Sequence, residues 1–287
     1  MTQATDITDW DAVRPLDPRE FEQIRKLAYR TFGLDLKPGK EDLVSVRLRK
    51  LVQSGGFRTF QDYYRHIVAD RTGQELASMI DALATNHTAF LREPDHFQFF
   101  RAQVLPQLAG RELLEAWSAA CSTGEEVWTL ACLLNEALPG RRIRLMATDI
   151  SNKALRFASA ACYPRERCGD LPAAWLSRYF VADGRPPQSY RVTAALRAQV
   201  QFQRINLVER LPWPHRFPVI FCRNVMIYFD RATQERVVQQ LAEHLEPGGY
   251  LFVGHAESLT RVSHGLDYVQ PAVYRNPCKK EKPWTRS

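Results

Sequence analysis

Three apolar, strand-like runs of the chain end in residues whose side chains or position suit a binding site. The runs lie at about 143–148, 200–205 and 218–223, and the residues at their ends are Asp149, Asn206 with Leu207, and Arg223 with Asn224. The carboxyl ends of parallel strands share one edge of an open α/β sheet, and ligands bind at that edge. These residues therefore predict a ligand site built from the ends of several strands.

A turn of small residues, Ser122-Thr-Gly-Glu-Glu126, separates another strand-like run at 113–118 from a helical pattern at 125–137. Small residues let a ligand approach the backbone, and the N-terminus of the next helix presents unpaired N–H groups. The two acidic side chains would repel a phosphate there and would suit a cationic ligand. Such a turn also occurs for packing reasons, so by itself it leaves both interpretations open.

Asp149 stands about 25 residues after this turn, where an acidic side chain can accept hydrogen bonds from the two hydroxyls of a ribose. The alternative is that Asp149 only helps Ser151 to cap the following helix. The turn upstream favours the ribose interpretation.

Strand-like and helical segments alternate after residue 112, which predicts an α/β domain with a mainly parallel sheet and helices on both faces. Strands are expected at 113–118, 143–148, 200–205, 218–223 and 249–254, and helices at 125–137, 151–160 and 231–245. The segment 163–199 is too long for a simple crossover between strands. It predicts a small inserted β-subdomain, with short antiparallel strands at 179–181 and 190–192.

The first hundred residues instead carry apolar side chains at helical spacing, which predicts a separate all-helical domain. Thr72 and Glu75 form a capping-box pattern at the start of one helix. Thr88 and Arg92, four positions apart, would share one face of another. The expected organisation is a flexible N-terminus at 1–16, a helical domain at 17–90, an α/β domain at 91–276 and a basic tail at 277–287.

Composition narrows the class of protein. No apolar run approaches the roughly 18 residues of a membrane span, and the acidic N-terminus is unlike a secretory signal. We therefore expect a cytoplasmic protein without direct membrane insertion. Its 6 cysteines include no Cys-x-x-Cys pair. Because His87, His96 and His255 also lack metal-ligand spacing, we expect no metal and interpret them as structural histidines.

The formal net charge of +7 is distributed unevenly. The stretch 43–61 contains no acid but carries Arg47, Arg49 and Lys50. From charge alone, this stretch is interpreted as the solvated face of a helix.

The turn and the strand ends, together with Thr88-Ala-Phe-Leu-Arg-Glu93 and Gly254-His-Ala-Glu257, resemble the bacterial chemotaxis receptor methyltransferases over about residues 17–275. The resemblance implies a class I (Rossmann-like) methyltransferase fold that uses S-adenosylmethionine, releases S-adenosylhomocysteine and needs no metal. The implied substrates are glutamate side chains in the cytoplasmic domain of membrane chemoreceptors, which become glutamyl methyl esters. A carboxylate is already ionised at neutral pH, so it needs no general base.

The resemblance also implies roles for single residues. Cofactor binding falls to Asn86, Thr88, Arg92, Glu125, Asp149, Asn206, Leu207, Arg223 and Asn224. Arg92 and Tyr228 are implied as the catalytic pair, although from the residues alone Tyr228 is equally well a core aromatic. Arg47, Arg49 and Lys50 are implied to dock the receptor. Whether the inserted subdomain binds a receptor peptide is left open by the loop 183–189.

Two other functions fit parts of the sequence. A nucleic-acid methyltransferase would explain the basic charge, but an amino-group methylase uses a polar-Pro-Pro-aromatic motif where this chain has Asn224-Val-Met-Ile. No nucleic-acid partner is therefore expected. A non-catalytic cofactor-binding module would be expected to lack Asp149, Arg92 or Tyr228, and all three are present.

Overall fold

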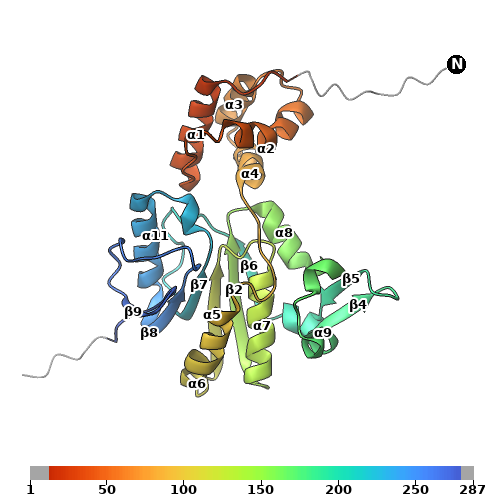
Figure 1. The fold of residues 1–287 in the computed structure, drawn as a ribbon, viewed down its shortest axis with the longest axis vertical. Coiled ribbons are helices and arrows are strands. Elements are labelled where there is room, and N and C mark those ends of the chain that lie inside the picture. The colour runs from red at the N-terminus through yellow and green to blue at the C-terminus, as the bar shows by residue number, and fades with distance from the viewer. Residues whose placement is uncertain (1–12, 279–287) are drawn as a thin grey trace, which may run out of the picture. The chain divides into compact units, whose positions relative to one another are not determined.

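The computed structural model describes residues 13–278, and the chain divides after Thr85 into two compact units. Figure 1 shows a small helical unit, drawn in red and orange, and a larger unit built on a sheet. Each unit has its own set of buried apolar side chains.

The first unit consists of four helices, which are α1 (Pro18–Phe32), α2 (Glu41–Ser54), α3 (Phe60–Ala69) and α4 (Gln74–Leu83). Asp17 begins α1 with a capping box, since its carboxylate accepts from the backbone of Glu20 and the Glu20 side chain accepts in return from the backbone of Asp17. Apolar side chains at helical spacing form the core, among them Ile24, Leu48, Phe60 and Met79. An all-helical unit is therefore confirmed.

Three details of this region differ from the sequence prediction. Helix α3 was not predicted. The capping box predicted at Thr72 was wrong, because the N-cap of α4 is Gly73, which has no side chain to accept a capping hydrogen bond. Asp70 takes over the role by accepting from the backbone N–H groups of Thr72 and Glu75. The helix expected to hold Thr88 and Arg92 was also wrong, since no helix lies between Leu83 and Pro94.

The second unit is built on a seven-stranded sheet with the order β6-β2-β1-β7-β8-β10-β9. Its strands are β1 (Leu113–Ala119), β2 (Arg142–Asp149), β6 (Val200–Arg204), β7 (Phe217–Cys222), β8 (Leu245–Phe252), β9 (Asp267–Gln270) and β10 (Val273–Arg275). The first five of these, β6 to β8 in sheet order, pair in parallel, whereas β10 runs antiparallel to both of its neighbours. The mainly parallel α/β sheet is thus confirmed, and the two C-terminal strands were not predicted.

Helices cover both faces of this sheet (Figure 1). They are α5 (Pro94–Phe99), the π-helix η1 (Phe100–Val104), α6 (Leu105–Leu108), α7 (Glu125–Ala137), α8 (Asn152–Ala160) and α11 (Arg231–Glu243). Side chains alternate between the two faces along a strand. In β7, Val219 and Phe221 join the core that contains Trp128 of α7, while Ile220 and Cys222 join the core that contains Val238 of α11.

The expected insertion is present as a three-stranded antiparallel sheet with the order β3-β5-β4. It contains β3 (Cys162–Pro164), the 3-10 turn η2 (Arg165–Cys168), α9 (Ala173–Tyr179), β4 (Phe180–Asp183), β5 (Ser189–Val192) and α10 (Ala194–Arg197). The two short strands predicted at 179–181 and 190–192 correspond to β4 and β5, which pair antiparallel.

Among residues 13–278 no helix is long and apolar enough to cross a membrane. Most of the predicted basic tail, like most of the predicted N-terminal segment, lies outside the described residues.

Candidate functional site

The turn between β1 and α7 is a tight backbone loop that only small residues can form. Ser122 has a φ of 51° and Gly124, the N-cap of α7, a φ of 97°. A Cβ at position 124 would lie 2.8 Å from Ala158 Cβ and 2.8 Å from the Tyr163 hydroxyl. Glycine is therefore required here both by the left-handed conformation and by the close approach of α8 and β3.

Asp149 joins this turn to the end of β2. Its Oδ2 accepts from the Ser122 N–H at 2.8 Å, and its Oδ1 accepts from the Ser151 N–H at 2.9 Å. The direct cap of α8 is Ser151, whose Oγ accepts from the Ala154 N–H. Asp149 therefore braces the turn at the sheet edge, and the ribose role remains a prediction.

Glu125 is the first acidic residue of α7, and its side chain is fully buried. It accepts from the Thr123 hydroxyl at 2.7 Å and from the Arg167 guanidinium at 2.8 Å. Burial raises the pKa of Glu125, and the bonds from Thr123 and Arg167 oppose that rise. Arg167 belongs to η2, so the inserted subdomain contributes directly to the turn.

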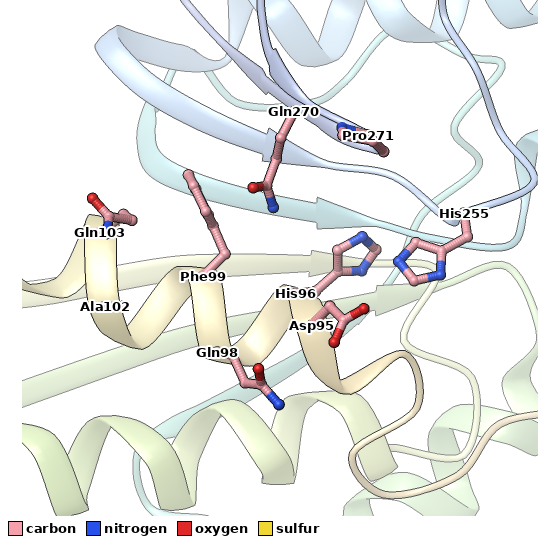
Figure 2. A pocket seen from close by; sticks show the side chains of 9 residues that line it. All are labelled: Asp95, His96, Gln98, Phe99, Ala102, Gln103, His255, Gln270 and Pro271. Carbon is pink, nitrogen blue, oxygen red and sulfur yellow. The ribbon is translucent and has the colours of Figure 1, made fainter.

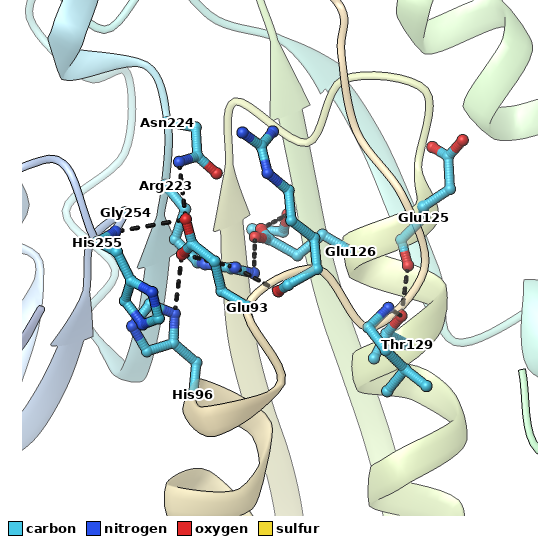
Figure 3. A network of polar contacts seen from close by, with 12 residues as sticks. Glu93, His96, Glu125, Glu126, Thr129, Arg223, Asn224, Gly254 and His255 are labelled. Carbon is cyan, nitrogen blue, oxygen red and sulfur yellow. Dashed lines mark hydrogen bonds and ion pairs between the residues drawn. The ribbon is translucent and has the colours of Figure 1, made fainter. Parts of the chain in front are cut away.

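A second buried network connects the end of β7 to α7 and to the start of α5 (Figure 3). Arg223 donates to Glu126 Oε2 at 3.0 Å, to Glu93 Oε2 at 2.9 Å and to the Arg92 carbonyl. Asn224, with a φ of 58°, donates from its amide to Glu93 Oε1 at 3.1 Å. The Arg223 guanidinium thus binds two carboxylates and a carbonyl, and its expected contact with the cofactor stays a prediction.

The pKa values of Glu93 and His96 are both lowered in this network. Burial would raise the pKa of Glu93, but hydrogen bonds from Asn224 and Arg223 outweigh it and lower the pKa to about 2. Burial lowers the pKa of His96 to about 4, and the nearby charge of Arg223 adds to the shift. At neutral pH Glu93 is therefore ionised and His96 is neutral.

Glu257 lies at the same edge, after the end of β8, and was predicted only as part of the Gly254-His-Ala-Glu257 motif, without a role of its own. Its carboxylate accepts from the backbone N–H groups of Gly254 (2.6 Å), Asn224 (2.7 Å) and Met226 (2.7 Å). A Cβ at Gly254 would lie 2.4 Å from the Asn224 amide nitrogen. The Gly-x-x-Glu spacing thus holds the β8 end against the turn after β7.

The segment that carries Asn86, Thr88 and Arg92 is irregular rather than helical. Leu91 and Glu93 both have positive φ, and Arg92 donates to the His87 carbonyl at 2.6 Å. Because Arg223 also holds the Arg92 carbonyl, this segment is fixed to the end of β7. Asn86, Thr88 and Arg92 are each partly exposed.

Tyr228 lies in the 3-10 turn η3 (Met226–Tyr228), four residues after Asn224. It is half-buried, so it is not the fully buried core aromatic that the residues alone allowed. Asn206 and Leu207 follow β6, where the Asn206 amide donates to Glu209 at 2.8 Å and Leu207 is buried. The carboxyl ends of β6, β2, β1 and β7 therefore carry all the strand-end residues that the sequence singled out.

In the helical unit, the three basic residues proposed for docking have different surroundings. Arg47 donates to the Leu83 carbonyl at 2.6 Å and to the Thr85 hydroxyl at 3.0 Å, so it helps to hold the C-terminal end of α4. Arg49 is half-buried and Lys50 is exposed. Val46, one turn before Lys50, is 73% exposed.

Two family models match the chain, one for each of its two units. Residues 86–274 match the family described as "CheR methyltransferase, SAM binding domain", and residues 19–84 match "CheR methyltransferase, all-alpha domain". The chain belongs to the CheR methyltransferase family. Its two parts meet between residues 84 and 86, where the structure also divides, rather than at residue 90.

Curated relatives match over nearly their whole length. Chemotaxis protein methyltransferase 2 of Pseudomonas aeruginosa is 37% identical over 260 residues, covering 89% of this chain and 92% of its own. The chemotaxis protein methyltransferase of Klebsiella aerogenes is 37% identical over 266 residues, covering 91% and 90%. That of Borreliella burgdorferi is 34% identical over 267 residues, covering 89% and 93%.

The residues at this edge fit S-adenosylmethionine. The ligand carries a sulfonium and an ammonium group and no phosphate, and acidic residues rather than basic ones lie at this edge, with Asp149 at the end of β2 and Glu125 in the first turn of α7. The Glu125 carboxylate is buried against Thr123 and Arg167, and Gly124 packs closely against Ala158 and Tyr163. The acidic character of the edge thus agrees with the family match.

Proposed function

We propose that this CheR-family methyltransferase transfers a methyl group from S-adenosylmethionine to glutamate side chains in the cytoplasmic domain of membrane chemoreceptors. The products are glutamyl methyl esters and S-adenosylhomocysteine. The observation that carries the proposal is that Arg92 and Tyr228 lie beside the end of β7, two strands from Asp149 at the end of β2 in the same parallel sheet. The relatives named chemotaxis protein methyltransferase support a role in chemotaxis, and the choice of receptor glutamates as substrate follows the resemblance noted in the sequence.

The chain's own task in this reaction is to position two groups. When bound, S-adenosylmethionine supplies an activated methyl group. Asp149 and Glu125, with the turn 122–126, hold the cofactor, and Asn86, Thr88, Asn206, Leu207 and Asn224 complete its surroundings. Arg92 and Tyr228 hold the glutamate carboxylate, because both side chains donate hydrogen bonds and Arg92 carries a positive charge. Alignment and exclusion of water then provide the rate enhancement.

Arg223 has a different part in this proposal from the one its sequence position indicated. It orients Arg92 by binding the Arg92 carbonyl. Its guanidinium also links the carboxylate of Glu93 to that of Glu126, the last residue of the turn 122–126. Its effect on the cofactor is therefore indirect.

Receptor docking is assigned to α2. Arg49 and Lys50 present positive charge to an acidic receptor surface. The exposed side chain of Val46, one turn earlier on α2, adds an apolar contact with the same surface. Arg47 contributes less to receptor binding, because its guanidinium already donates hydrogen bonds to the Leu83 carbonyl and the Thr85 hydroxyl.

The test is incubation of the protein with methyl-labelled S-adenosylmethionine and membranes that contain candidate chemoreceptors. We expect label in the receptor band and its release as methanol by mild base, because glutamyl esters hydrolyse there and methylated amines do not. Receptor with glutamine at its acidic sites is the matched control. Binding of S-adenosylhomocysteine without any labelled protein would favour a non-catalytic cofactor-binding module. Label in nucleic acid would favour a nucleic-acid methyltransferase.

A further inference from the structure

His96 is a buried histidine without hydrogen-bond partners. The residue is buried, and neither Nδ1 nor Nε2 makes a hydrogen bond to a described residue, although Nδ1 lies beside the Glu93 carboxylate. Buried polar atoms are hydrogen-bonded in the large majority of cases, so a buried ring in which neither nitrogen makes a hydrogen bond requires an explanation. The ring sits in the first turn of α5 and faces two other possible ligand residues (Figure 3).

Those residues are Glu93 and His255. The Glu93 carboxylate oxygen Oε2 lies 3.3 Å from His96 Nδ1, and the ring centroids of His96 and His255 are 4.5 Å apart. One ligand atom from each of the three residues lies within 4.8 Å of the others. Two residues at the start of α5 and one residue from the loop after β8, far away in the sequence, therefore lie close together.

The spacing suits a tetrahedral ion. Zinc binds imidazole nitrogen at about 2.0–2.1 Å and carboxylate oxygen at about 2.0–2.2 Å, which places two ligands of one tetrahedral ion roughly 3.3–3.5 Å apart. The observed separation of His96 Nδ1 and Glu93 Oε2 is 3.3 Å. His255 is exposed, so its ring is able to rotate into the third position.

The charge balance admits a second cation beside Arg223. That guanidinium is shared between Glu93 at 2.9 Å and Glu126 at 3.0 Å, so the carboxylates outnumber it. A carboxylate has about four acceptor positions. On Glu93, Oε1 takes the Asn224 amide and a long contact from the His255 N–H, whereas Oε2 takes Arg223 and still faces His96.

A pocket reaches the two histidines of this cluster. A pocket of about 510 Å³ is lined by His96, His255 and Asp95, together with Phe99 and Gln270 (Figure 2). That volume accommodates a hydrated ion, and a water molecule is able to remain as the fourth ligand. Asp95 adds a further negative charge at the pocket wall.

We propose that Glu93, His96 and His255 form a binding site for a zinc-type divalent ion, with water as the fourth ligand. Two neutral imidazoles and one carboxylate are a ligand set that zinc uses elsewhere in proteins. A bound ion would join the start of α5 to the loop after β8, two segments that are also in contact through the His255 N–H and the Glu93 carboxylate. The site lies outside the residues assigned to cofactor and receptor.

The test is titration of metal-free protein with Zn²⁺ by calorimetry and with Co²⁺ by visible absorption. We expect one ion per chain and the intense absorption of tetrahedral Co²⁺. His255→Ala removes a ligand at an exposed position and should weaken binding about tenfold or more. His66→Ala is the matched control, because His66 also faces a carboxylate, Glu75 at 3.7 Å, but belongs to no three-residue cluster among the described residues. His66→Ala should bind zinc like the wild type.

A third variant protects the test from a simple folding defect. His255→Cys substitutes one zinc ligand for another, so its Co²⁺ complex should gain a sulfur-to-cobalt charge-transfer band that the wild type lacks. Absence of stoichiometric binding in the folded wild type would overturn the proposal. Equal affinity in His255→Ala, or a Co²⁺ complex of His255→Cys without the new band, would do so as well.

Discussion

At the scale of single residues, two carboxylates organise the proposed site by accepting backbone N–H groups. Asp149 fixes the turn that follows β1, and Glu257 fixes the turn that follows β7. Hydrogen bonds to a charged acceptor are shorter and stronger than those between neutral groups. The two turns are therefore set in place before a ligand arrives, which reduces the entropy lost on binding.

Asp149→Ala should weaken the binding of S-adenosylmethionine. Loss of a charge-assisted acceptor costs about 1.5–3 kcal/mol, and the Ser122 N–H would lose its present partner as well. Titration calorimetry with S-adenosylhomocysteine measures the change, and Asp170→Ala, at an exposed position of the insert, serves as the charge-matched control. Unchanged affinity would restrict Asp149 to bracing the turn and the start of α8.

Arg92 and Tyr228 should affect turnover far more than cofactor affinity. If they hold the substrate carboxylate, Arg92→Ala should lower kcat about 100-fold and Tyr228→Phe about tenfold, as expected for loss of a charged and of a neutral donor. Arg92→Lys, which keeps the charge, should recover part of the loss. Steady-state methylation of receptor with parallel calorimetry separates the two effects. Full activity in either alanine or phenylalanine variant at saturating receptor would remove that residue from the catalytic pair.

At the scale of elements, the sequence predicted what periodicity controls. Helix α7 begins and ends at the predicted residues 125 and 137, and the central strands lie within a few residues of their predicted ranges. The segment 88–92 was wrongly predicted as helix because four-residue spacing alone does not make one. There Arg223 and Thr129 bind its backbone from distant parts of the chain. Strands β9 and β10 depend on pairing at the sheet edge, which local pattern does not reveal.

The approach of His96 to His255, and of Arg167 to Glu125, could not be predicted for the same reason. Each pair is distant in the sequence, and only the fold brings its members together. Residues at strand ends were predictable because sheet topology places all carboxyl ends of parallel strands at one edge.

Arg167 tests whether the inserted subdomain supports the cofactor turn. Removing its guanidinium leaves the buried Glu125 carboxylate with the Thr123 hydroxyl as its side-chain donor among the described residues, so Arg167→Ala should weaken S-adenosylhomocysteine binding by about 1–2 kcal/mol. The estimate is modest because Arg167 is 43% exposed. Arg165→Ala, at an exposed position of the same turn, is the control. Equal affinity for S-adenosylhomocysteine in the two variants would mean that the ion pair between Arg167 and Glu125 does not support cofactor binding.

At the scale of the whole molecule, the division after Thr85 separates two tasks. Each unit has its own core, and all residues proposed to bind cofactor lie in the second unit. The basic residues proposed to bind receptor lie on α2 in the first. Changes on the surface of α2 should therefore alter receptor recognition without altering the cofactor site.

The final prediction concerns charge reversal on α2. Arg49→Glu combined with Lys50→Glu should raise KM for receptor about threefold to tenfold and leave calorimetric affinity for S-adenosylhomocysteine unchanged. Arg47 is left intact, because its bonds to Leu83 and Thr85 would make its reversal a test of folding. Arg65→Glu with Arg71→Glu makes the same change of net charge on exposed positions elsewhere in the helical unit.

Salt should distinguish docking from a general charge effect. Exposed charges act over a screening length of about 8 Å at physiological ionic strength, so added salt should raise KM of the wild type. The α2 variant should respond less, because the charges that salt screens have been removed, and the Arg65/Arg71 variant should follow the wild type. Equal changes of KM in both double variants would mean that net charge alone attracts the receptor. No change in either would return α2 to a solvated helix face.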